Sequence, residues 1–158
     1  MRSILFLCFT LFPALVAIAG NADQSFPTDA EGQRKLGIMY IGSDDDMAFF
    51  WTKKAAEQGD GIAQNNLGVM YENGVGIKKD TDESLKWISK AAKNDIPEAQ
   101  YTLAMELING GRLKKDPATA LNLLERSANK GHSQAQLELG LSYLLGDGTK
   151  KDYKKAIY

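Results

Sequence analysis

Cysteine and histidine are almost absent from this chain of 158 residues, which contains one of each, Cys8 and His132. A metal site that needs two imidazoles, or paired cysteines at zinc spacing, therefore cannot be assembled from this chain alone. The sequence predicts neither a metal nor any other cofactor. A chain without disulfide bonds must draw its stability from packing.

An excess of basic residues is also missing. Lys and Arg together number 19 against 20 Asp and Glu, which gives a formal net charge of −1. Nucleic-acid-binding proteins normally carry a basic excess or a basic stripe, so we expect no nucleic-acid partner. With 44% hydrophobic and 25% charged residues, the composition is that of one ordinary globular domain.

Long apolar runs are limited to one, Ile4–Ala19, whose 16 residues are fewer than the roughly 18 to 20 that cross a bilayer. This run follows Arg2 and precedes small residues, which is the pattern of a secretory signal peptide. We assign residues 1–22 to this peptide and favour cleavage after Ala22 over cleavage after Ala19, so that Cys8 is lost with it. The mature chain, 23–158, is expected to be periplasmic or secreted and to have no membrane span.

The rest of the chain repeats itself. The motif Ala63-Gln64-x-x-Leu67-Gly68-x-x-Tyr71 recurs, with substitutions, at 99–107 and at 135–143, each copy 36 residues after the last. An earlier copy at 32–40 lies 31 residues upstream, and Lys-Lys-Asp recurs at 78–80, 114–116 and 150–152. Such periodicity is typical of proteins built from stacked repeats. The units are predicted at about 29–60, 61–96, 97–132 and 133–158.

Within each unit the spacing of residues predicts two helices. Leu67 and Tyr71 are four residues apart and so share a helix face, while Gly68 beside them allows a neighbouring helix to approach closely. The segment Gly74–Gly76 breaks this helix, and Asp80 is suited to cap the start of the next one. Asp116 and Asp152 are the corresponding residues of the third and fourth units, and in the first unit the run Asp44, Asp45 and Asp46 is expected at the positive end of the second helix's dipole. The predicted fold class is therefore all-α.

These motifs resemble the Sel-one-like repeat (SLR) family, helical-hairpin relatives of the tetratricopeptide repeat, in its secreted bacterial type. The resemblance implies a right-handed α-solenoid of two-helix units, with three full units and a truncated fourth. Leu107, Arg112 and Leu123 depart from the family pattern, which has an aromatic residue, a glycine and a tryptophan at these positions. The cysteine-rich branch of the family joins its hairpins with disulfides that this chain lacks, so nothing particular to that branch is transferred.

The sequence assembles no catalytic site, and we expect no enzyme. Ser127-x-x-Lys130 has the active-serine spacing of penicillin-binding enzymes, and some cysteine-rich relatives have been linked to β-lactams, so a β-lactam-binding or hydrolysing protein is the alternative function. However, Ser127 aligns with Ala91 inside the second helix of its unit, where a packing role is favoured. His132 follows a turn, where a surface position is favoured over a general base that lacks partners.

The family resemblance implies that side chains of each first helix line the inner surface of the solenoid, where a protein partner would bind. The candidate partner-binding residues are Arg34, Ile38, Asn65, Val69, Glu72, Tyr101, Met105, Ile108, Leu137 and Leu141. The expected roles are an adaptor or scaffold, a host-interaction factor, or an immunity-type inhibitor that neutralises a toxin. Tyr101, Met105, Leu137 and Leu141 either form the apolar half of this groove or pack between units, and the sequence leaves both alternatives open.

The first helix of the fourth unit is apolar on nearly all sides, so we expect it to be covered on more than one. The sequence stops at Tyr158, inside the second helix of that unit. Either it is a fragment, or this uncapped repeat is covered by a second copy, as a homodimer, or by another protein. The six lysines of the Lys-Lys-Asp turns are expected along one edge, as solvated loop charges rather than as a ridge for an anionic envelope component.

Overall fold

The computed structural model describes residues 26–157, and within them the only regular secondary structure is helical. The predicted signal peptide, 1–22, and both of its cleavage points lie outside the described residues. The helices are α2 (Ala30–Tyr40), α3 (Asp45–Glu57), α4 (Gly61–Asn73), α5 (Thr81–Lys93), α6 (Pro97–Asn109), α7 (Pro117–Asn129) and α8 (Ser133–Leu145), followed by the 3₁₀ turn η1 (Lys155–Ile157).

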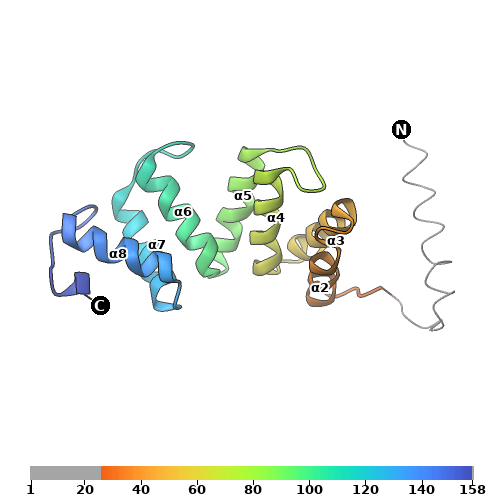
Figure 1. Cartoon of the computed structure of the whole chain (residues 1–158), viewed down its shortest axis with the longest axis horizontal. Helices are drawn as coiled ribbons and strands as arrows, with labels where there is room; N and C mark the ends of the chain where they lie inside the picture. Colours follow the sequence, from red (N-terminus) through yellow and green to blue (C-terminus); the bar gives the residue numbers. More distant parts are fainter. Residues whose placement is uncertain (1–25, 158) are drawn as a thin grey trace.

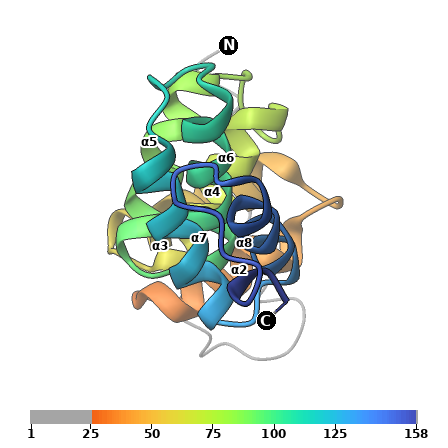
Figure 2. The same cartoon turned by 90° about the vertical axis from the view of Figure 1, so that its left-hand side faces the viewer.

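The helices form successive hairpins along one axis (Figure 1). In each hairpin a first helix, here called helix A (α2, α4, α6 and α8), packs on a second, helix B (α3, α5 and α7), and each helix B also packs on the helix A of the next unit. Seen from the α8 end, the units are rotated around that axis rather than stacked in register (Figure 2). This arrangement confirms the predicted right-handed all-α solenoid of two-helix units.

An aspartate begins each helix B, as the sequence predicted. The side chain of Asp44 accepts a hydrogen bond from the Met47 N–H at 3.0 Å, and that of Asp80 accepts one from Glu83 at 2.9 Å. Asp116 repeats this bond, and the Thr119 hydroxyl that also donates to it lowers the pKa of its carboxyl. These carboxylates satisfy N–H groups that no helical carbonyl can reach, and they lie at the positive end of the helix dipole.

Small residues allow the two helices of a hairpin to approach closely. A Cβ built on Gly68 would lie 2.7 Å from the Ile88 side chain and 3.2 Å from the Ser84 carbonyl oxygen, so a larger residue there would force Ile88 to move or α4 and α5 to separate. Leu67 is fully buried among alanines of neighbouring helices. The leucines at the equivalent positions, Leu36, Leu103 and Leu139, are only half-buried. The predicted equivalence of the four positions therefore holds for the helix face but not for the depth of burial.

The glutamine of each repeat motif has a structural role that the sequence did not reveal. The Nε2 atoms of Gln64, Gln100 and Gln136 donate to carbonyls at the C-terminal end of the preceding helix B, those of Ala56, Ala92 and Ala128, at 3.2 to 3.3 Å. These carbonyls are among those left without a partner inside a helix. Each glutamine therefore binds the last turn of the preceding unit to the first helix of its own unit.

The turn from helix B to the next helix A requires one residue in the left-handed region. Gly59 and Gly131 fill this position, with φ of +94° and +85°, and Asp95 fills it with φ of +60°. The Asp95 carboxylate accepts hydrogen bonds from Arg126 and from the Gln100 Nε2, and the Arg126 bond lowers the pKa of this carboxyl. Side-chain bonds thus hold an aspartate where the other units use glycine.

The loop from helix A to helix B leans on the preceding unit. A Cβ on Gly76, whose φ is +64°, would lie 2.0 Å from the Asp45 carbonyl oxygen at the start of α3. Gly148 approaches the Pro117 carbonyl of α7 in the same way. In the third unit Arg112 stands at this position, and its guanidinium donates to the equivalent carbonyl, that of Thr81, at 2.8 Å. The departure from the family pattern thus replaces a close backbone contact by a side-chain hydrogen bond.

The described part of the chain contains neither a membrane-spanning helix nor a group of metal-ligating side chains. None of its helices is both long and apolar enough to cross a bilayer. Within residues 26–157, no three His, Cys, Asp or Glu side chains are grouped so that they could hold a metal ion.

Candidate protein-binding surface

One apolar side chain occupies the same solvent-facing position on every helix A. These residues are Ile38, Val69, Met105 and Leu141, which follow one another at the repeat spacing. Ile38 and Val69 are 46% and 47% exposed, Leu141 is 40% exposed, and Met105 is half-buried. We call the side of the four A helices that carries this row the A-face. Four of the ten candidate partner-binding residues therefore occupy one repeated position, with one of them on each helix A.

Arg34 of the candidate set is engaged within the chain. Its Nε lies 3.0 Å from Oδ2 of Asp60, and both side chains are largely buried. Asp60 is also the N-cap of α4, because its other oxygen accepts the Ala63 N–H at 2.8 Å. The ion pair therefore joins the first helix A to the start of the second.

Tyr101 also contacts the N-cap residue of the next helix A, but through an aromatic ring contact instead of an ion pair. Its ring stacks on the His132 ring with centroids 4.9 Å apart, and the Nδ1 of His132 accepts the Ala135 N–H as the N-cap of α8. Tyr101 and Ile108 also pack against the buried cluster around Leu124. Tyr101 therefore contacts the N-cap of the next unit, which agrees with packing between units, one of its two alternatives, while Ile108 packs against a cluster that lies mainly in its own unit. His132 occupies a turn, as expected, but the sequence did not indicate its capping role.

Glu72, another candidate, belongs to an ion-pair cluster on the A-face. Arg112 Nη1 lies 2.8 Å from a carboxylate oxygen of Glu72, and Nη2 lies 2.6 Å from one of Glu106. The Arg112 hydrogen bond lowers the pKa of the Glu106 carboxyl, and the two carboxylates raise the pKa of the guanidinium. The cluster ties the loop of the third unit to α4 and α6.

Replacing Arg112 by alanine is expected to reduce the free energy of unfolding by up to about 1 kcal/mol near pH 7, the upper limit for ion pairs that water screens. Because the pKa of Glu106 is lowered in the fold, its pairing stabilises the protein above the carboxyl's unfolded pKa of about 4.3 and is lost as the pH falls through the folded value. Urea unfolding should therefore show the difference between wild type and Arg112→Ala shrinking from pH 7 to pH 3.

The control for this prediction is Lys86→Ala, which removes an exposed pair with Glu83 inside a single helix. We expect a much smaller change in stability for this variant at both pH values. A difference between wild type and Arg112→Ala that is the same at pH 7 and pH 3 would show that only the bond to the Thr81 carbonyl matters.

The remaining candidate residues differ in exposure. Asn65 is half-buried, and Leu137 is 63% exposed. Leu144 and Leu145 are exposed beside Leu137 and Leu141 on α8. The main contacts of α8 within the described residues are with α7 and with η1. The opposite side of α8 is open to solvent.

Ser127, the residue behind the β-lactam alternative, is fully buried in α7. Its Oγ donates to the Pro97 carbonyl at 2.7 Å across the contact between α7 and α6. A nucleophilic serine must reach a substrate, and this hydroxyl is both enclosed and bonded to the backbone. The geometry therefore gives Ser127 the packing role that its alignment with Ala91 predicted.

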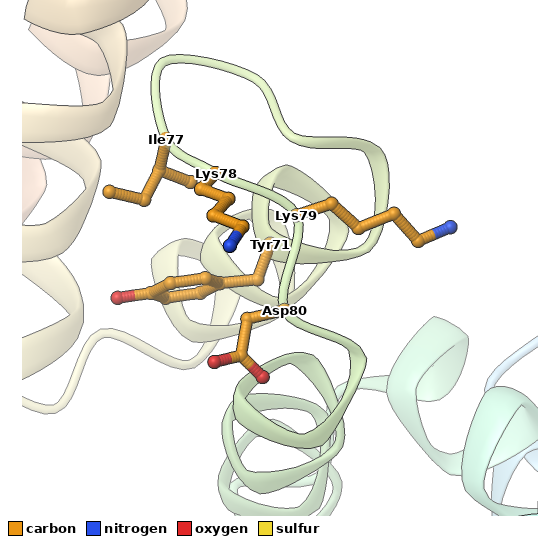
Figure 3. A pocket seen from close by; sticks show the side chains of 5 residues that line it. All are labelled: Tyr71, Ile77, Lys78, Lys79 and Asp80. Atoms are coloured by element: carbon orange, nitrogen blue, oxygen red, sulfur yellow. The ribbon is translucent and has the colours of Figure 1, made fainter.

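An open hollow of about 310 Å³ lies under the loop that joins α4 to α5. It is lined by Tyr71, Ile77, Lys78, Lys79 and Asp80, with the Tyr71 ring beneath the Lys78 side chain (Figure 3). Burial raises the pKa of the Tyr71 phenol, and the carboxylates of Glu83 and Asp80 add to this. In the fourth unit the corresponding phenol, Tyr143, instead donates to Glu125 at 2.6 Å. The phenols at this repeated position thus have different surroundings in the second and fourth units.

The six lysines of the Lys-Lys-Asp turns are all exposed in the loops between helix A and helix B. Those of the second and third units lie in the two long loops on the upper edge of Figure 1. In the described residues, no carboxylate lies within ion-pair distance of these lysines. This arrangement is that of solvated loop charges.

Two solved structures are similar to this chain over most of its length. A Sel1 repeat protein from Oxalobacter formigenes shares 38% sequence identity, with a TM-score of 0.76, over 82% of this chain and 55% of that one. The protein c5321, a protective antigen present in uropathogenic Escherichia coli strains and displaying an SLR fold, shares 33% identity with a TM-score of 0.74. That match covers 82% of this chain and 29% of c5321, so this chain spans only part of the length of both proteins.

No curated protein matches the chain. The model of the Sel1 repeat matches it four times, at residues 30–60, 61–96, 97–132 and 133–158, which are nearly the boundaries expected from the periodicity. The capped hairpins, the glutamines between units and the similarity to two solenoids at 38% and 33% identity all indicate the same architecture of repeated helical hairpins. The chain belongs to the Sel1 repeat family.

Proposed function

We propose that this chain is an exported protein-interaction module that binds its partner on the A-face and performs no chemistry of its own. Sel1 repeat proteins are generally protein-interaction modules, and this chain carries four such repeats. The observation that carries the proposal is the row of apolar side chains at one solvent-facing position of all four A helices. Apolar side chains that gather on an exposed surface mark interaction sites more often than apolar residues scattered singly.

Export to the periplasm or beyond rests on the sequence of residues 1–22. Among the roles open to an exported module, we propose an adaptor or an inhibitor of another protein. Both need only a rigid, shaped surface, which the hairpin stack supplies through buried alanines and capped helices. A second copy bound at α8 is a further proposal, and its support is the open apolar side of that helix.

The proposal is tested by capture in the native envelope. Val69→Asp and Leu141→Asp, combined in one chain, place two charges on exposed positions of the A-face, where a folded monomer tolerates them. Crosslinking of the tagged wild-type chain in cells, followed by identification of the captured proteins, should yield a partner that this double variant loses. Circular dichroism and the melting temperature of the variant check that its fold is intact.

The matched control is Tyr153→Asp, which changes a residue that is also exposed but lies in the loop before η1. Capture should survive this change. A partner retained by the A-face variant, or lost equally from the control, contradicts binding through the A-face. Light scattering on the purified mature chain tests the second copy separately, since a monomer at high concentration contradicts it.

A further inference from the structure

Basic residues are missing from three of the four A helices. Helices α4, α6 and α8 contain no Lys or Arg, and their charged residues are all glutamates: Glu72, Glu98, Glu106 and Glu138. The B helices carry basic and acidic residues in equal number, six of each, and the first helix A, α2, contains Arg34 and Lys35 beside Glu31. The purely acidic character is therefore confined to α4, α6 and α8.

The basic side chains that do reach the A-face are already paired. Arg34 is bound to Asp60, and Lys35 lies 2.7 Å from Glu31 on the same helix. Arg112, which comes from a loop, is shared by the carboxylates of Glu72 and Glu106. These three cations of the described chain are therefore already offset by carboxylates.

Two carboxylates on the A-face have no such partner. Within the described residues, neither Glu98 on α6 nor Glu138 on α8 accepts a side-chain hydrogen bond or lies in an ion pair. Glu98 lies seven residues before Met105, and Glu138 lies three residues before Leu141, so each shares a helix face with the apolar residue of its unit. The C-terminal half of the A-face thus combines apolar side chains with unneutralised negative charge.

We infer that the A-face binds a positively charged segment of another protein, in which apolar side chains are flanked by Lys or Arg. The apolar side chains of this segment cover Met105, Leu141 and the leucines beside them, and its cations approach Glu98 and Glu138. Complementary charge speeds association and excludes wrong partners more than it adds affinity, so the carboxylates select the partner while the apolar row holds it. The same charge disfavours anionic lipids and nucleic acids. This inference rests on the proposed function and specifies the chemistry of its partner.

The test uses three fluorescein-labelled synthetic peptides of equal length and fluorescence anisotropy with the purified mature chain. One peptide contains Leu at helical spacing with Lys between, the second replaces every Lys by Glu, and the third replaces every Leu by Ser. We expect binding of the Leu/Lys peptide alone, weakening as NaCl is raised because exposed charges are screened. Equal binding of the Leu/Glu peptide would overturn the inference.

The variant Glu98→Gln with Glu138→Gln should weaken binding of the Leu/Lys peptide roughly three- to tenfold, as expected for the loss of two exposed ion pairs. The matched control is Glu57→Gln with Asp82→Asn, which removes the same charge from the B helices α3 and α5. The control should leave binding within about twofold of wild type. A control that weakens binding as much as the A-face variant would show an effect of net charge alone and overturn the inference.

Failure of this inference can be told apart from failure of the proposed function. If Val69→Asp with Leu141→Asp abolishes capture in the envelope while the glutamine variant binds the Leu/Lys peptide as wild type does, the A-face binds a protein but does not select positive charge. If the aspartate variant also leaves capture unchanged, the proposed function itself is wrong.

Discussion

Gly76→Ala is expected to lower the free energy of unfolding by about 3 kcal/mol. Two costs combine in this small change. The backbone at this position has φ of +64°, where any residue with a Cβ is strained by roughly 1 kcal/mol. The new Cβ would also lie 2.0 Å from the Asp45 carbonyl oxygen and 2.8 Å from the Phe49 Cβ, so the loop must move away from α3.

The control that separates the two costs is Gly59→Ala. Gly59 also has a positive φ, +94°, but no described atom lies within 4 Å of a Cβ built there. This variant should lose only the roughly 1 kcal/mol of backbone strain. Chemical denaturation of both variants measures the difference, which is the energy of the contact between the loop and α3. Equal losses in the two variants would mean that the loop does not rest on the preceding unit.

Gln100→Ala is expected to destabilise the fold by about 2 to 3 kcal/mol, because it opens a cavity and removes two buried side-chain hydrogen bonds, although the Ala92 carbonyl keeps the Asp95 N–H as a donor. Gln100 is fully buried, and its Nε2 donates to the Ala92 carbonyl and to the Asp95 carboxylate. Urea unfolding of the variant should show a lower midpoint with an unchanged slope.

Gln136→Ala is the matched control, because Gln136 makes the equivalent bond to the Ala128 carbonyl from an exposed position. Water can replace the missing donor there, so a loss below about 1 kcal/mol is expected. A similar loss at both positions would show that the glutamines act through helix formation and not through burial of the bond.

The hairpins could be predicted from the sequence because their signals are local. Asp80 begins a helix wherever its unit lies, and the spacing of Leu67 and Tyr71 fixes one helix face without reference to any other unit. A pattern that is weak in one copy becomes specific because it occurs four times. The unit boundaries and the solenoid could therefore be predicted together. The same reasoning placed Ser127 inside a helix pair, because it aligns with Ala91.

The contacts between units could not be predicted in the same way. Whether Arg34 faces a partner protein or Asp60 depends on how far one hairpin is rotated against the next, and a periodic sequence does not encode that angle directly. Tyr101 was assigned to both alternatives for this reason. The recurring Ala-Gln pair did carry a signal, since a glutamine next to buried alanines needs a hydrogen-bond partner, and the end of the preceding helix B provides it.

Contacts between units in this solenoid are strictly local in the chain. Among the side-chain hydrogen bonds within residues 26–157, the one with the largest separation in sequence joins Arg112 to Glu72, 40 residues apart. Contact order is therefore low, and no step of folding has to close a long loop. Such a chain can start to fold at any hairpin and extend by adding neighbours, so the folding rate should change little when a whole 36-residue repeat is inserted between two others.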